Sequence, residues 1–113
     1  MKIETNAKVV TIYLNSTDQW HGQPLYAAIV QLCQERGLAG ATVYRCTEGY
    51  GAGRELHTTR ILELADNMPV RLEIVDIAER IDSFLPALDG MIGEGLVTIG
   101  DVRVWRYLPD PKE

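Results

Sequence analysis

One segment of the chain joins a strand pattern directly to a helix pattern, Val70-Arg71-Leu72-Glu73-Ile74-Val75-Asp76-Ile77-Ala78-Glu79-Arg80-Ile81. In its first half, apolar side chains at 70, 72 and 74 alternate with a more polar set at 71, 73 and 75. A period of two is typical of a strand that is buried on one face. We therefore expect a strand over residues 70–75.

A helix is expected to follow this strand at once. Asp76 can cap it, and Glu79 three residues later completes a capping-box pattern. Pro86 lies inside the helix pattern and lacks a backbone N–H, so we expect a kink there, or a break with Ser83 capping a second segment. Gly93-Glu94-Gly95 is expected to end the helix. Its apolar stripe is Ile77, Ile81, Phe84, Leu85, Leu88 and Ile92.

The remaining chain repeats this alternation of strand and helix. Strand patterns cover residues 8–14, 41–46 and 96–107, the last with a potential interruption at Gly100-Asp101. An apolar stripe with helical spacing covers residues 24–36, with Gly37 as its stop. Residues 60–64 fit either a strand or a helical turn. The order β-α-β-β-α-β predicts an α+β, ferredoxin-like sandwich, with two helices on one face of a four-stranded antiparallel sheet.

Composition narrows the class of protein. The 113 residues fit a single domain, 1–113. The net charge of −5, without a run of lysine or arginine, argues against nucleic-acid binding. No apolar run is long enough for direct membrane insertion, and the first residues lack the apolar core of a signal peptide, so we expect a cytoplasmic protein. Cys33 and Cys46 are expected to be buried free thiols; a disulfide between them is the alternative.

The sheet face without helices combines Val9, Thr11, Tyr13, Arg71, Glu73 and Val75. Such a face is too apolar for simple exposure and too polar for a core. Mixed surfaces of this kind mark assembly interfaces, and symmetric homo-oligomers are the commonest assemblies.

A glycine-rich segment over residues 48–59 is the main candidate site. Its glycines, Gly49, Gly51 and Gly53, can present backbone amides to an anion, and Arg54, His57, Thr58 and Thr59 can add donors. The alternative is a simple hairpin connection. Two other groups have structural alternatives as well. Arg103, Trp105 and Tyr107 share one strand face that suits a subunit contact better than a stacked base. Trp20 and His21 precede a helix N-terminus, which can bind an anion, but a structural role in anchoring that helix is favoured.

Four motifs together resemble the PII-like family catalogued as domain of unknown function 190, over residues 7–107. They are Trp20-His21-Gly22-Gln23-Pro24-Leu25-Tyr26, Gly37-Leu38-Ala39-Gly40-Ala41-Thr42-Val43, Glu48-Gly49-Tyr50-Gly51-Ala52 and Gly95-Leu96-Val97-Thr98. The resemblance implies a relative of the nitrogen regulatory PII signal-transduction proteins. It implies a homotrimer with sheets facing the threefold axis, and nucleotide sites in the clefts between subunits.

The resemblance also implies which residues bind. The output loop falls on residues 49–59 and the second ligand loop on Gly93-Glu94-Gly95. The expected ligand-binding residues are Gly49, Tyr50, Gly51, Gly53, Arg54, His57, Thr58, Gly93, Glu94 and Gly95. The sequence departs from true PII proteins in its short loop and in Leu96, where those proteins carry a phosphate-facing lysine.

We expect no enzyme, because the sequence has neither a nucleophile elbow nor a phosphate-binding P-loop. No cofactor is required, and the expected effector is a small anion, an adenine nucleotide. The expected partner is a membrane transporter or another regulated protein. One alternative is a protein-interaction module without a ligand. A second is a metal-binding trimer, although Cys33, Cys46, His21 and His57 lack zinc-ligand spacing.

Overall fold

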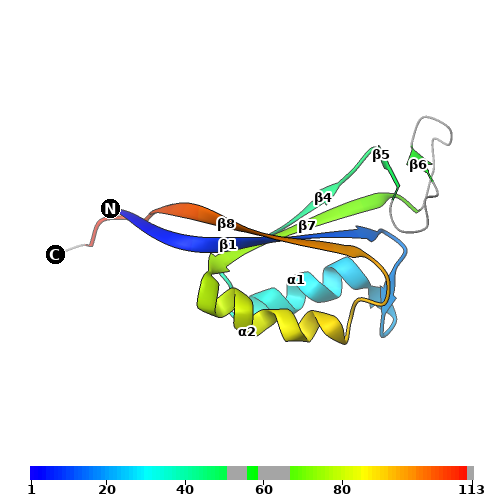
Figure 1. Cartoon of the computed structure of the whole chain (residues 1–113), viewed down its shortest axis with the longest axis horizontal. Coiled ribbons are helices and arrows are strands. Elements are labelled where there is room, and N and C mark those ends of the chain that lie inside the picture. Colours follow the sequence, from blue (N-terminus) through cyan, green and yellow to red (C-terminus); the bar gives the residue numbers. More distant parts are fainter. Residues whose placement is uncertain (51–55, 59–66, 112–113) are drawn as a thin grey trace.

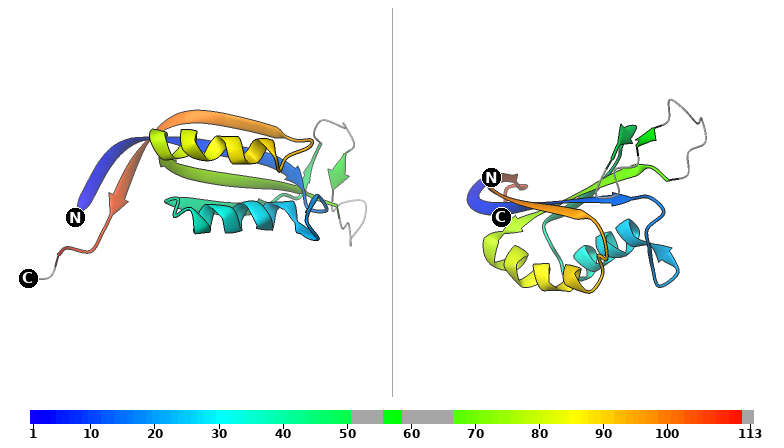
Figure 2. Two further views of the ribbon diagram at one scale, coloured as in Figure 1. Left: turned by 90° about the horizontal axis from the view of Figure 1, so that it is seen from below. Right: turned by 45° about the vertical axis from the view of Figure 1, so that its right-hand side comes forward.

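A computed structural model describes residues 1–50, 56–58 and 67–111. Ten elements follow one another along the chain (Figure 1): β1 (Lys2–Asn15), β2 (Gln19–Trp20), β3 (Gln23–Pro24), α1 (Leu25–Glu35), β4 (Gly40–Arg45), β5 (Glu48–Gly49), β6 (His57–Thr58), β7 (Pro69–Ile77), α2 (Ala78–Asp89) and β8 (Leu96–Tyr107). The four long strands form one antiparallel sheet in the order β4-β7-β1-β8. Both helices cover the same face of that sheet (Figure 2), which confirms the predicted ferredoxin-like α+β sandwich.

The core lies between the sheet and the two helices. Alternate side chains of β1 and β7 enter it because successive residues of a strand point to opposite faces. Phe84 of α2 is 1% exposed at its centre. Lys8 attaches the edge of α2 to β1, since its Nζ donates to Asp82 Oδ1 at 2.8 Å, and this bond raises the pKa of Lys8. The core cluster is Val10, Ile12, Leu14, Leu25, Ile29, Cys33, Leu72, Ile74, Ile81, Phe84 and Leu88.

The first helix matches its predicted signals. Pro24 immediately precedes α1, where its missing N–H leaves no helical bond unmade. At the other end Gly37 adopts a φ of +67°. Its N–H donates to Gln34 O at 3.0 Å, and Leu38 N–H donates to Cys33 O at 3.1 Å. These two bonds form a Schellman motif, whose left-handed residue glycine adopts without strain.

The start of the second helix corrects the capping prediction. Asp76 belongs to β7, and Ile77 occupies the N-cap position of α2 without a side-chain cap. The Asp76 carboxylate instead accepts from Ala39 N at 3.0 Å, in the link between α1 and β4, and from Ile77 N at 2.7 Å. The carboxylate therefore binds the backbone of a distant segment, at Ala39, and does not form the predicted capping box with Glu79.

Three further boundaries differ from expectation. The helix continues through Pro86 without a break at Ser83, and it ends at Asp89, ahead of Gly93-Glu94-Gly95. The last strand runs through Gly100-Asp101 without interruption. The first strand begins six residues earlier than expected, at Lys2, because Lys2 to Asn6 pair with Tyr107 to Arg103. The segment at 60–64 lies outside the described residues.

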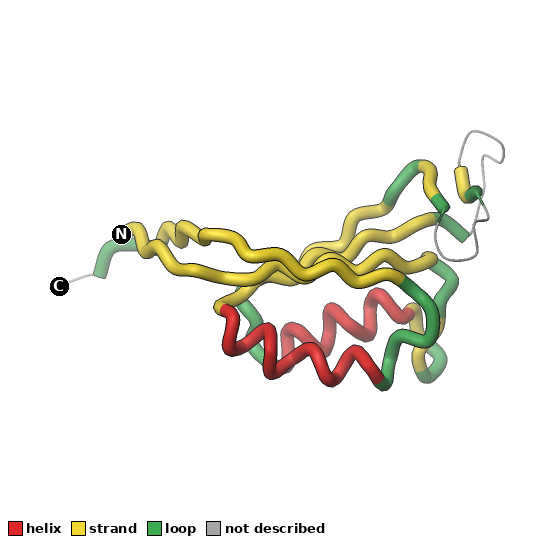
Figure 3. The backbone as a smooth tube through the Cα atoms, viewed as in Figure 1, coloured by secondary structure: helices red, strands yellow, loops and turns green. Residues whose placement is uncertain are grey.

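The extra length of β1 and β8 forms a two-stranded ribbon that projects beyond the helices (Figure 3). The chain ends meet there: the terminal amine of Met1 lies 2.7 Å from Asp110 Oδ1. Lys2 Nζ lies 4.1 Å from the centre of the Trp105 ring, and Arg103 pairs with Glu4 at 3.2 Å.

Both cysteines are free, as predicted, but only Cys33 is buried; Cys46 is half-buried. Burial raises the pKa of the Cys33 thiol to about 11. At pH 8, three units below this pKa, the thiolate fraction of Cys33 is about one in a thousand, and the thiolate is the reactive form. We expect an aromatic disulfide reagent to label one thiol rapidly in the native protein and two after denaturation. Cys46→Ser should remove the rapid phase; two rapid equivalents in native wild type would contradict the burial of Cys33.

Candidate functional site

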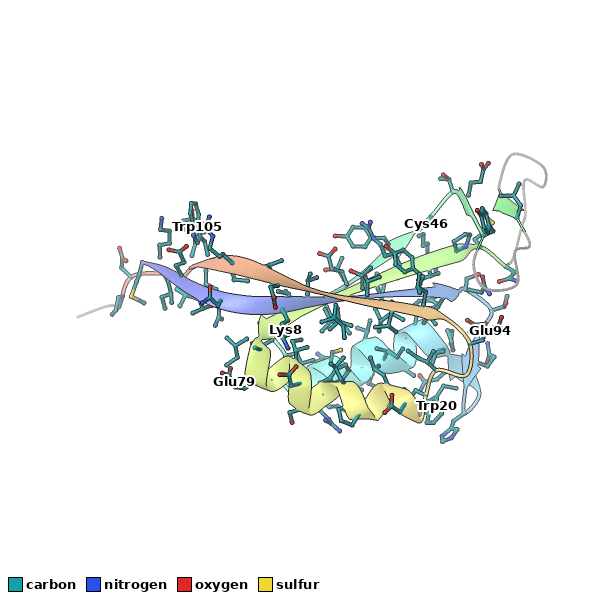
Figure 4. All side chains as sticks on the ribbon, viewed as in Figure 1. Lys8, Trp20, Cys46, Glu79, Glu94 and Trp105 are labelled. Carbon is teal, nitrogen blue, oxygen red and sulfur yellow. The ribbon has the colours of Figure 1, made fainter. Side chains whose placement is uncertain are left out.

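The two loops that carry the predicted ligand residues lie at the same end of the sheet. Strand β4 ends and β7 begins there, flanking the segment 46–68, and β8 begins there after the loop 90–95. Figure 4 places Cys46 and Glu94, one beside each loop, at that end of the molecule. The same end also holds the 16–24 connection between β1 and α1.

The glycine-rich segment starts as a short hairpin. Gly49 pairs with His57 and Glu48 pairs with Thr58, which joins β5 to β6. Gly49 packs closely at the base of this hairpin, since a Cβ there would lie 3.4 Å from Pro69 Cγ. Tyr50 follows and is 71% exposed. The predicted residues Gly51, Gly53 and Arg54, together with Thr59, lie outside the described residues, and only the backbone strand is described for His57 and Thr58.

The second loop is open at one glycine and tightly packed at the other. A side chain at Gly93 would meet no atom within 4 Å. Glu94 is exposed. A Cβ at Gly95 would lie 3.1 Å from Tyr13 O and 3.2 Å from Leu14 Cδ2. Gly95 is thus required where β8 enters the sheet beside β1, and Gly93 and Glu94 face solvent.

The described residues of these two loops lie apart. The segment 46–68 leaves the edge strand β4 and returns to the inner strand β7, whereas the loop 90–95 leads into the opposite edge strand, β8. At about 4.8 Å for each strand spacing, β7 lies roughly 10 Å from β8 and β4 lies roughly 14 Å from β8. Two hollows among the described residues lie elsewhere. One, of about 430 Å³, lies between the helices beside Trp20; the other, of about 570 Å³, lies beside the ribbon at Asn6 and Arg103.

The charge at this end is acidic in the part of the chain that the structure describes. Asp18, Glu48 and Glu94 belong to its turns, and the described residues of the three connections include no lysine or arginine. The long side chain of Arg45 turns toward the helix layer, where it donates to Tyr26 Oη at 3.2 Å. The described residues of these three connections therefore offer no lysine or arginine to an anion, and Arg54 and Arg60 lie outside the described residues.

A network that the sequence analysis missed anchors the base of the glycine-rich segment. Ser16 N donates to Met68 O at 2.8 Å, and Met68 N donates back to Ser16 Oγ at 2.9 Å. Thr17 Oγ1 donates to Asn67 Oδ1 at 2.9 Å. The run Asn15-Ser16-Thr17-Asp18 is rich in residues that bond backbone groups in turns, which was the available signal. This network holds Asn67 and Met68, just before β7, against the end of β1.

The structure also gives the positions of the remaining candidate residues, Trp20, His21 and Trp105. Trp20 stacks on His21 with ring centres 4.2 Å apart, and His21 adopts a left-handed φ of +48° in the turn ahead of α1. Trp105 lies on the projecting ribbon, remote from both loops (Figure 4). Within the described residues, no group of three or more histidine, cysteine, aspartate or glutamate side chains could hold a metal ion. Neither described helix is long and apolar enough to cross a membrane.

Comparison with known proteins gives relatives along most of the chain. Residues 7–104 match the family DUF190, described as an uncharacterized group. A UPF0166 protein of Aquifex aeolicus (strain VF5) is 36% identical over 86% of this chain and 91% of its own length. A UPF0166 protein of Methanocaldococcus jannaschii is 39% identical over 88% of this chain and 93% of its own length.

Solved structures share the fold at low sequence identity. CPII from Thiomonas intermedia K12, a nitrogen regulatory PII-like protein bound to ADP, AMP and bicarbonate, superposes with a TM-score of 0.60 at 16% identity, over 90% of this chain and 91% of its own. A putative PII-like signaling protein from Thermus thermophilus superposes with a TM-score of 0.58 at 21% identity, over 91% of each chain. The sheet and helices described above are therefore the fold of PII-like proteins.

Proposed function

The chain belongs to the DUF190 family, and from this premise we propose that it is a cytoplasmic, PII-like regulatory protein that assembles as a homotrimer. It binds a small anionic effector, an adenine nucleotide, in clefts between subunits and acts on a partner protein. It performs no catalysis and needs no fixed cofactor.

One observation carries the proposal: the two predicted ligand loops share one end of the sheet, but one begins at the edge strand β4 and the other ends at the opposite edge strand, β8. A site shared between subunits would bring the two loops together, because the β4 edge of one chain can meet the β8 edge of the next. Such a site would also supply the cations that the described turns of one chain lack. The proposed site residues remain Gly49, Tyr50, Gly51, Gly53, Arg54, His57, Thr58, Gly93, Glu94 and Gly95.

The test is a thermal-shift panel of ATP, ADP, AMP, cyclic nucleotides, S-adenosylmethionine and bicarbonate, followed by calorimetry. A ligand that binds only the folded protein stabilises it by RT ln(1 + [L]/Kd), about 2.7 kcal/mol at a hundredfold excess over Kd. We expect a rise in Tm with an adenine nucleotide that Arg54→Ala abolishes. The matched control is Arg106→Ala, because Arg106 is exposed on the ribbon. No shift with any member of the panel would overturn the effector.

A second function is favoured by a different observation. Two large side chains within the glycine-rich segment are exposed, Tyr50 at 71% and Leu56 at 50%. Exposed aromatic and aliphatic groups on a hairpin are suited to docking on another protein. In this alternative the chain is a protein-interaction module without a small ligand that regulates a membrane transporter. A silent ligand panel would favour it over the effector-binding function.

A further inference from the structure

On the sheet face without helices, side chains of different kinds occupy separate rows. Strand register arranges its side chains in rows that cross the sheet from β4 through β7 and β1 to β8. The first row contains Tyr44, Arg71, Tyr13 and Leu96; the second contains Thr42, Glu73, Thr11 and Thr98; the third contains Gly40, Val75, Val9 and Gly100. Arg71 and Glu73 are the two charged residues of this set, and both lie on the inner strand β7.

Arg71 is held in place but leaves one buried hydrogen-bond donor unsatisfied. Its guanidinium carbon lies 4.2 Å from the centre of the Tyr44 ring, and Tyr13 is its neighbour on the other side, in β1. The Nε atom of Arg71 is buried and has no hydrogen-bond partner. A buried donor without an acceptor is costly, and in native proteins such groups call for an explanation.

Glu73 has the carboxylate that Arg71 needs as a hydrogen-bond acceptor, but it does not bind Arg71 of its own chain. It lies two residues from Arg71 and on the same face, so the two Cα atoms are about 7 Å apart. Among the described residues, Glu73 has no hydrogen bond, and no cationic nitrogen lies within 4.0 Å of it. The stacking of Arg71 on Tyr44 directs the guanidinium along the row toward β4, away from the threonine row that holds Glu73.

A second copy of this chain presents the complementary charges. We propose that Arg71 of one subunit pairs with Glu73 of the next, which makes the open sheet face a head-to-tail interface between copies of this chain. This inference rests on the proposed homotrimer and names a contact that stabilises it. In a closed ring each subunit contacts one neighbour through its Arg71 and the other neighbour through its Glu73. Every Arg71 and every Glu73 is then paired.

The surroundings strengthen such a pair. Val9, Val75, Leu96 and the two tyrosine rings would exclude water from it, and arginine can bind a carboxylate through two parallel hydrogen bonds. Gly40 and Gly100 end the third row without side chains, which allows a second sheet to approach closely there. Like charges brought together at such an interface oppose assembly strongly.

The experiment compares oligomeric state across protein concentration by sedimentation velocity and native mass spectrometry. Wild type should be trimeric. Arg71→Glu and Glu73→Arg should each raise the concentration at half-assembly by at least about tenfold, with unchanged circular dichroism. Arg71→Gln and Glu73→Gln, which are less disruptive to folding, should act in the same direction. Glu35→Arg, an equal charge change on the exposed surface of α1, should assemble like wild type.

Mixing the two reversed variants isolates the contact between chains. One variant carries two acidic residues on this face and the other two basic residues. In a mixed ring of three, two of the three contacts join opposite charges and one joins like charges, so an equimolar mixture should assemble at a lower protein concentration than either variant alone. Assembly of both single variants at wild-type concentrations, or no recovery on mixing, would overturn the pairing and leave the trimer standing. A wild type that stays monomeric at all concentrations would overturn the trimer itself, and the pairing with it. Recovery of assembly by inorganic phosphate, without mixing, would assign Arg71 to a bound anion and reject the pairing.

Discussion

Phe84→Ala is expected to lower the free energy of unfolding by about 3–5 kcal/mol. Phe84 is the single phenylalanine of the chain, is 1% exposed and lies in the core cluster between α2 and the sheet. Its removal forfeits the transfer free energy of the ring and leaves a cavity that a close-packed interior fills only partly. No other described side chain of the helix layer fills as much of the core.

The loss is measured by urea denaturation followed by circular dichroism, at one fixed protein concentration because assembly contributes to apparent stability. Phe84→Leu keeps most of the volume and should cost less than Phe84→Ala. Tyr107→Ala truncates an aromatic side chain that is exposed on the ribbon, so its effect should stay within about 0.5 kcal/mol. A loss below about 1 kcal/mol for Phe84→Ala would show that α2 does not pack on the sheet as described.

The fold was predictable because its signals are local. Alternation at Val70, Leu72 and Ile74 and the apolar stripe from Leu25 to Cys33 each read directly onto one buried face. The ribbon was not predictable. Residues 2–6 are mostly polar, and they become a strand only because they pair with residues 103–107 at the far end of the chain.

The errors at the second helix have the same origin. The spacing of Asp76 and Glu79 is a genuine capping pattern, yet the Asp76 carboxylate binds Ala39 N, which is 37 residues away. Sequence patterns near a helix cannot reveal a competitor that the fold brings in from elsewhere. The candidate site was likewise predictable only in part. Gly49 and Gly95 were identified as special positions, but the hydrogen bonds of Ser16 with Met68 depend on the fold.

Asp76→Ala is expected to destabilise the protein by about 2–4 kcal/mol, because it leaves two backbone donors without their acceptor. The carboxylate is 7% exposed and joins three segments. It accepts from Ala39 N and Ile77 N, and its Oδ2 lies 3.4 Å from Arg80 Nε. Arg80 in turn donates from Nη2 to Arg36 O at 2.8 Å, so the end of α1 is tied to the start of α2 through these two side chains.

The comparison with Glu79→Ala separates this network from a capping box. If Asp76 acted as a helix cap with Glu79, both substitutions would weaken the start of α2 by comparable amounts. In the network described here, Glu79→Ala should cost less than about 0.5 kcal/mol, and Asp76→Asn, which retains one acceptor oxygen, should fall between the two. Hydrogen exchange gives the local readout: Asp76→Ala should speed exchange of the Ala39 and Ile77 amides before the core strands respond. Equal losses in Asp76→Ala and Glu79→Ala, with Ala39 exchange unchanged, would restore the capping interpretation, because the carboxylate would then act on its own helix alone.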